Sequence, residues 1–212
     1  IQADSGSDNY EKRPYATLKE HVNFIDEGKE TDLPDDFYSS TFYTNKAIEY
    51  IKGNQGSGKP FFSYIAYQAN HIPVQAPKAF IDKYKGKYKD GWTVLRQKRR
   101  EKAVELGLIP KDSQMLPMAQ GDWNALSEQD RAYQERRMEV YAGMADAMDH
   151  EVGRLIAYLK ESGQYDNTVF IFLSDNGAEG SDPFAVKAGK LWIESNYSTD
   201  IDRLGGKGAY SI

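Results

Sequence analysis

The residues best suited to chemistry lie at 175–177, where an apolar run over residues 168–173 gives way to Ser174 and then Asp175, Asn176 and Gly177. A carboxylate followed by an amide carbonyl offers the hard oxygen donors that Ca²⁺ or Mg²⁺ prefers. The alternative is a plain turn, because Asn-Gly is a strong hairpin signal. A hairpin is disfavoured because residues 178–190 show no alternating partner strand. Asp175 and Asn176 are therefore candidate metal ligands.

A second polar cluster follows residues 60–67, another apolar and aromatic run, and it contains His71. The imidazole is the usual proton carrier near neutral pH. A histidine beyond a strand is more often a packing or hydrogen-bonding residue, but two apolar runs that both end in polar clusters favour a site. His71 is thus a candidate catalytic residue.

The elements between these clusters indicate an α/β domain with a largely parallel sheet flanked by helices. Residues 60–67 and 168–174 read as strands buried on both faces, and ligands collect beyond the carboxyl ends of such strands. Helices are expected from about 43 to 52 and over 76–105 with a break at 86–91. The clearest helix has a single apolar stripe, capped upstream at Ser127. We expect that stripe to pack in the core: Met138, Tyr141, Ala145, Met148, Val152, Leu155 and Leu159.

Composition excludes several classes of protein and of site. The 212 residues carry a net charge of −5 with basic and acidic residues interspersed, so no nucleic-acid partner is expected. The absence of cysteine excludes disulfides and thiolate sites. No apolar stretch reaches the ~20 residues that span a bilayer. No leader is visible after Ile1, and the cellular compartment stays open between a periplasmic or secreted location and a cytoplasmic one.

Two sequence clusters resemble the type I sulfatases, and arylsulfatases of bacterial type most closely. They are residues 61–77, which include His71, and residues 172–180, which include Asp175 and Asn176. Residues 33–40 and 138–149 are also similar to connecting segments of that family. The resemblance covers most of the chain from about residue 30 to 180, and it implies the alkaline-phosphatase-like α/β fold.

The resemblance also implies roles. Asp175 and Asn176 would bind the divalent cation, Ca²⁺ with Mg²⁺ as the alternative, that holds the sulfate oxygens. His71 would contact the sulfate ester near the leaving oxygen. The family's formylglycine nucleophile arises from Cys or Ser in a Cys/Ser-x-Pro-x-Arg motif, which has no match here and is expected outside this segment. The family's lysine beyond the metal strand has three candidates without a motif: Lys187, Lys190 and Lys207.

We therefore expect residues 1–212 to form a single incomplete sulfatase catalytic domain. It would have an irregular lead-in at 1–40, an α/β core at 41–180 and a loop-rich tail at 181–212. The substrate would be a small-molecule or sugar sulfate ester, and this segment alone should be inactive. Two alternatives stay open: a phosphodiesterase or phosphonate hydrolase of the same fold, and a non-catalytic binding domain. The oligomeric state is not predicted.

Overall fold

The computed structural model describes residues 1–17, 20–118, 120–177, 180 and 182–212. It contains a small antiparallel sheet in the order β1 (Gln2–Ala3), β2 (Phe24–Asp26) and β3 (Lys29–Thr31). The turn from β2 to β3 has positive φ at Glu27 (50°) and Gly28 (79°). A two-residue hairpin needs this conformation to match the twist of its strands.

Five α-helices account for most of the remaining regular structure. Within the described ranges they are α1 (Ser39–Asn54), α2 (Lys78–Ile81), α3 (Gly91–Glu105), α4 (Glu128–Glu161) and α5 (Lys187–Asn196). Single 3₁₀ turns occur at Asp82–Tyr84, Trp123–Ala125, Tyr165–Asn167, Pro183–Ala185 and Ile201–Arg203. The expected helices near 43–52 and 76–105, with the break, are confirmed. No helix among these residues is long and apolar enough to cross a membrane.

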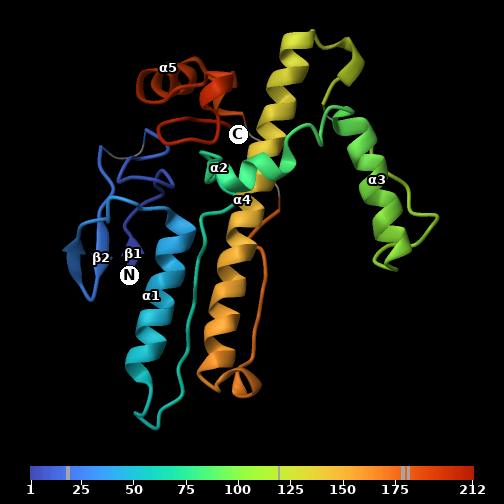
Figure 1. Cartoon of the computed structure of the whole chain (residues 1–212). Coiled ribbons are helices and arrows are strands. Elements are labelled where there is room, and N and C mark those ends of the chain that lie inside the picture. Colours follow the sequence, from blue (N-terminus) through green and yellow to red (C-terminus); the bar gives the residue numbers. More distant parts are fainter. Residues whose placement is uncertain (18–19, 119, 178–179, 181) are drawn as a thin grey trace.

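Helices α1 and α4 lie side by side and form the central layer (Figure 1). Helix α4 begins where the sequence indicates, because the Ser127 hydroxyl accepts a hydrogen bond from the Asp130 amide at 3.0 Å. Across the layer, the Thr41 hydroxyl donates to Glu151 at 2.8 Å. Glu151 is buried and is also paired with Arg154 at 2.5 Å, so its charge is compensated.

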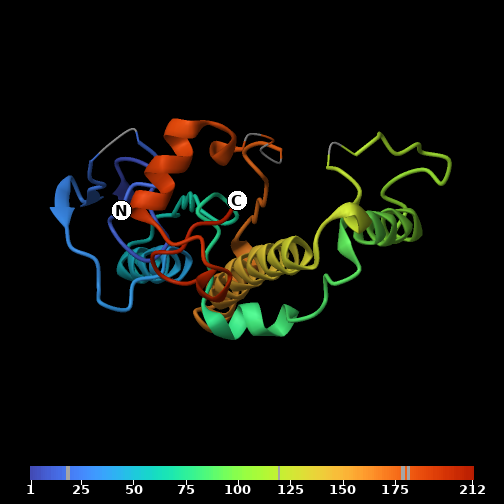
Figure 2. The same ribbon diagram turned by 90° about the horizontal axis from the view of Figure 1, so that it is seen from above.

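The two apolar segments expected to be buried strands, residues 60–67 and 168–174, are extended but unpaired. Both run in the same direction along the α1 and α4 layer, and both lie on the face opposite α2 (Figures 1 and 2). Neither pairs with a strand among the described residues, and Phe62 and Ile171 are 92% and 80% exposed. The prediction of burial was therefore wrong for this chain. The helices cover one side of the two segments, and neither segment forms a β-bridge with the described backbone.

The buried side of α4 also differs from the predicted stripe. Leu159 is buried as expected, but Tyr141 is 43% exposed and the others are half-buried. The fully buried stripe passes through Val140, Met144, Ala147 and Glu151. Side chains at adjacent helix positions point about 100° apart around the helix axis, so a stripe shifted by one residue faces a different side. Which of the two stripes is buried depends on where α1 and α2 pack.

The main core cluster contains residues of α2 and α4, of the segment just before α2, and of the C-terminal segment at Leu204. Its members are buried aliphatic or small side chains: Val74, Ala76, Ile81, Val140, Met144 and Leu204. Gly143 permits this packing, because a Cβ at that position would lie 2.8 Å from the Ile81 Cα and 2.9 Å from its amide nitrogen. The two helices thus approach each other backbone to backbone.

We predict opposite effects for two glycine substitutions in α4. Gly143→Ala should lower the free energy of unfolding by about 1–3 kcal/mol, because the added methyl displaces Ile81. Gly153→Ala, at a helical position with nothing within 4 Å, should raise it by about 0.5–1 kcal/mol. Urea unfolding of both variants measures this. Equal effects would show that α2 does not pack closely on α4.

Candidate active site

Asp175 and Asn176 lie in an exposed bend that ends the second extended segment. Asp175 Oδ1 accepts a hydrogen bond from the Asn176 amide at 3.1 Å, and the Ser174 hydroxyl donates to the Asn176 carbonyl at 2.6 Å. Among the described residues, Asp175 Oδ2 and the side-chain oxygen Oδ1 of Asn176 have no hydrogen-bond partner. Their chemistry fits a hard divalent cation.

The donor set is nevertheless incomplete. No group of three or more His, Cys, Asp or Glu side chains that could hold a metal ion occurs among the described residues. Ca²⁺ takes 6–8 oxygen ligands, so Asp175 and Asn176 could supply only part of its coordination. Glu179, which follows Gly177 closely, lies outside the described residues.

His71 is exposed, and the state of its ring follows from one contact. Its Nδ1 is 2.8 Å from the Ile72 carbonyl oxygen. A carbonyl oxygen only accepts hydrogen bonds, so the hydrogen of the neutral ring belongs on Nδ1. Among the described residues, Nε2 has no hydrogen-bond partner, so in the neutral ring it is an available acceptor.

No hydrogen bond joins His71 to Asp175 or Asn176. The two extended segments that precede these residues run in the same direction along the α1 and α4 layer, so both segments end toward the same end of that layer (Figure 1). Their convergence on one substrate stays a prediction. Of the candidate lysines, Lys190 is 3.8 Å from Glu194 and Lys207 is 3.5 Å from Glu11. Lys187 begins α5 and is exposed.

A buried polar network fixes the backbone that follows His71, and Gln75 lies at its centre. The Gln75 side chain accepts from the Asn9 amide at 2.9 Å and donates to Asp8 Oδ2 at 2.8 Å and to the Ala209 carbonyl at 2.9 Å. Asn9 Nδ2 in turn donates to the Pro73 carbonyl at 3.0 Å. The sequence gives only one hint of this network, a glutamine among apolar residues after His71.

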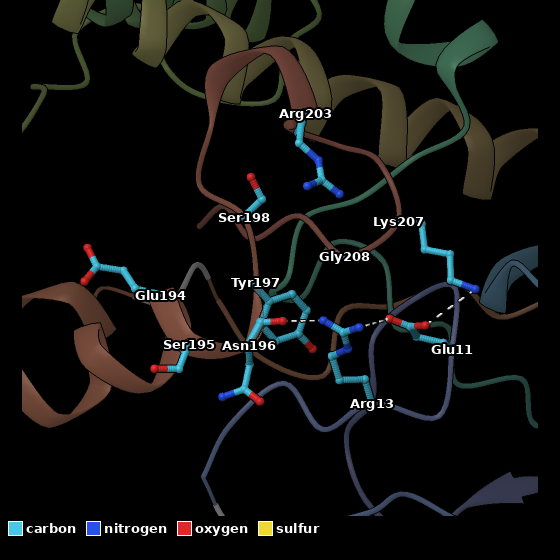
Figure 3. A pocket seen from close by; sticks show the side chains of 10 residues that line it. All are labelled: Glu11, Arg13, Glu194, Ser195, Asn196, Tyr197, Ser198, Arg203, Lys207 and Gly208. Atoms are coloured by element: carbon cyan, nitrogen blue, oxygen red, sulfur yellow. Dashed lines mark hydrogen bonds and ion pairs between the residues drawn. The ribbon is translucent and has the colours of Figure 1, made fainter.

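An open, polar pocket of about 480 Å³ lies beside the last turn of α5 (Figure 3). His71, Asp175 and Asn176 do not line it. Its lining mixes both signs of charge: Glu11, Arg13, Glu194, Ser195, Asn196, Tyr197, Ser198, Arg203, Lys207 and Gly208. Arg13 is already engaged, because it pairs with Glu11 at 2.8 Å and lies 5.0 Å from the centre of the Tyr197 ring. The pocket is therefore distinct from the predicted site.

The chain belongs to the sulfatase family. The sequence model of that family matches residues 2–204, nearly the whole chain. The expectation drawn from the two sequence clusters is confirmed at this level.

Individual relatives agree. A Schizosaccharomyces pombe protein described as an uncharacterized sulfatase is 43% identical over 148 residues, which are 68% of this chain and 26% of that protein. An arylsulfatase of Klebsiella aerogenes is 34% identical over 193 residues, 90% of this chain and 41% of its own length. A multifunctional alkaline phosphatase superfamily protein of Trinickia caryophylli is 32% identical over 162 residues, which are 73% of this chain and 30% of that protein. The chain thus spans less than half the length of these relatives.

Burial also perturbs the acid–base behaviour of the network behind His71. Desolvation raises the pKa of the Asp8 carboxyl from 3.8 to about 6, although hydrogen bonds from Gln75 and the Tyr10 amide oppose this rise. The folded chain therefore keeps a proton on Asp8 in a pH range where the unfolded chain has lost it. Ionised Asp8 destabilises the fold relative to its protonated form.

We predict that this carboxyl makes the chain less stable as pH rises through the interval from about 4 to about 6. The folded state binds more protons there, so the free energy of unfolding falls with pH. The difference of about two units between the Asp8 pKa in the folded and in the unfolded chain corresponds to about 3 kcal/mol in the free energy of unfolding. Urea unfolding of the wild type and of Asp8→Asn between pH 4.5 and 7 measures the effect. The variant should lack this slope, and parallel pH profiles would contradict the assignment.

Proposed function

We propose that the protein hydrolyses sulfate monoesters. The observation that carries this proposal is the family match over residues 2–204. It is supported by the coexistence, in one chain, of a histidine with a free Nε2 and of the Asp175 and Asn176 oxygens. The natural substrate would be a small-molecule or sugar sulfate ester.

In this proposal His71 acts on the leaving oxygen. The hydrogen bond from Nδ1 to the Ile72 carbonyl occupies that nitrogen, and Nε2 has no hydrogen-bond partner among the described residues. When protonated, Nε2 can donate to the ester oxygen as the S–O bond breaks. A donor placed there stabilises the negative charge that develops in the transition state.

Asp175 and Asn176 would hold a divalent cation, Ca²⁺ or alternatively Mg²⁺, through their side-chain oxygens. When bound, such a cation neutralises the charge on the sulfate oxygens. The remaining metal ligands and the formylglycine nucleophile would come from outside residues 1–212. We therefore expect turnover only from the full-length product of the gene.

We further propose that residues 60–67 and 168–174 are parallel strands of an alkaline-phosphatase-like sheet. Their apolar composition, common direction and exposed outer faces support this assignment. Pairing with further strands would bury Phe62, Ile171 and their neighbours, and it would bring both polar clusters to one sheet edge.

A phosphodiesterase or phosphonate hydrolase is the second candidate, and the similarity to the multifunctional alkaline phosphatase superfamily protein favours it. Tetrahedral sulfate and phosphate groups make similar demands on a cation and a proton donor. Parallel rates with 4-nitrophenyl sulfate and phosphate esters separate the two activities. Absence of turnover on every ester would favour a non-catalytic binding domain.

For Asp175 we predict that Asp175→Ala lowers the rate of 4-nitrophenyl sulfate hydrolysis at least about 100-fold in the full-length enzyme, because a direct ligand should matter more than the outer groups whose loss costs 10–100-fold. Added Ca²⁺ should restore part of the rate. Asp166→Ala, an exposed aspartate in the preceding 3₁₀ turn, is the matched control. An undiminished rate in Asp175→Ala refutes the metal role.

For His71 we predict that His71→Gln lowers kcat by about 10²–10⁴. The loss should be largest for phenyl sulfates with poor leaving groups, because they depend most on the donated proton. His21→Gln, another exposed histidine, should leave the rate unchanged. A loss that is independent of the leaving group would contradict proton donation by His71.

A further inference from the structure

The Tyr15 ring contacts both Gly6 and His71. Its centre is 4.9 Å from the centre of the imidazole, and the two planes meet at 75°, an edge-to-face contact. The ring also lies close to Gly6, because a Cβ at that position would be 1.9 Å from Tyr15 Cε1 and 2.5 Å from Cδ1. Only a glycine at position 6 leaves room for the ring in this position.

The backbone that carries Tyr15 is held at three consecutive residues. Arg13 donates to the Asn196 carbonyl, pairs with Glu11 and covers the Tyr197 ring (Figure 3). The Tyr197 hydroxyl donates to the Pro14 carbonyl at 2.7 Å, and the Tyr210 hydroxyl donates to the Tyr15 carbonyl at 3.3 Å.

Both tyrosine hydroxyls stay protonated at neutral pH. Burial raises the pKa of Tyr210 to about 12 and also raises the pKa of Tyr197. Both groups therefore remain donors, and these bonds persist throughout the neutral range.

Because these contacts hold the backbone at residues 13–15, the Tyr15 ring is a rigid packing surface for His71. An exposed imidazole in a bend would otherwise sample several rotamers. The edge-to-face contact with the Tyr15 ring and the Nδ1 bond to the Ile72 carbonyl together select one orientation. In that orientation Nε2 has no hydrogen-bond partner among the residues that the structure describes.

We propose that Tyr15 is a positioning residue: its ring, which packs against Gly6, holds the imidazole of His71 in a single orientation and tautomer. The structural part of this proposal concerns the chain itself. The catalytic part rests on the proposed function of His71.

Nitrogen-15 NMR of the His71 side chain in the 212-residue chain tests the structural part. The wild type should show a protonated Nδ1 and an unprotonated Nε2 in the neutral form, with ring-current shifts on the imidazole protons. Tyr15→Leu should average the two tautomers and abolish those shifts, whereas Tyr15→Phe should preserve both. Tyr88→Leu, which removes another half-buried tyrosine stacked on a ring, should have no effect. Unchanged His71 signals in Tyr15→Leu would overturn the proposal.

A second variant keeps the test decisive if Tyr15→Leu does not fold. Gly6→Ala retains the tyrosine but forces its ring away from position 6. It should change the His71 signals in the same direction as removal of the ring. Wild-type signals in a folded Gly6→Ala chain would show that the ring does not control His71.

Kinetics of the full-length enzyme test the catalytic part. Tyr15→Leu should lower kcat on the order of 10- to 100-fold with little change in KM, because misplacement of a reacting group has this cost. Tyr15→Phe should restore the rate. If the NMR changes occur while kcat is unchanged, Tyr15 orients the ring but His71 is not the proton donor. That result rejects the function of His71 and not its positioning.

Discussion

The hydrogen bonds of Gln75 are the constraint on which the rest of the structure depends. This one buried side chain bonds to the N-terminal segment at Asp8 and Asn9 and to the C-terminal segment at Ala209. A buried amide left without partners costs free energy, so the three segments are stable only together. The backbone of Val74 adds a bond to the Ser211 carbonyl at 3.0 Å. His71 precedes this junction directly, and its position therefore depends on both terminal segments.

Local signals in the sequence predicted the helices well. The Ser127 cap, the break at 86–91 and the long helix through Leu159 all follow from chemistry within one or two turns. The choice of buried stripe in α4 failed because it depends on contacts with Ile81 and Thr41, which are distant in sequence. The burial of residues 60–67 and 168–174 failed for a related reason: an apolar run predicts a strand, but burial requires neighbours that the described residues do not supply.

The site was only partly accessible to sequence reasoning. Asp175, Asn176 and His71 were predicted because residue types and their position after apolar runs indicate chemistry, and their roles stay a prediction. Tyr15 and Gly6 gave no comparable signal, since the contact of Tyr15 with His71 joins positions more than 50 residues apart and Gly6 acts only through Tyr15. The family resemblance named the reacting groups. Only the three-dimensional structure identified the side chains packed around them.

The network at Gln75 also affects the order in which parts of the chain become structured during synthesis. Its hydrogen bonds join residues separated by 67 positions to Asp8 and by 134 positions to Ala209. Contacts of such long range form late in folding. During synthesis from the N-terminus, the backbone beside His71 gains its final support only after Ala209 has left the ribosome. The nascent chain would therefore carry His71, the proposed proton donor, long before the surroundings of that residue are complete.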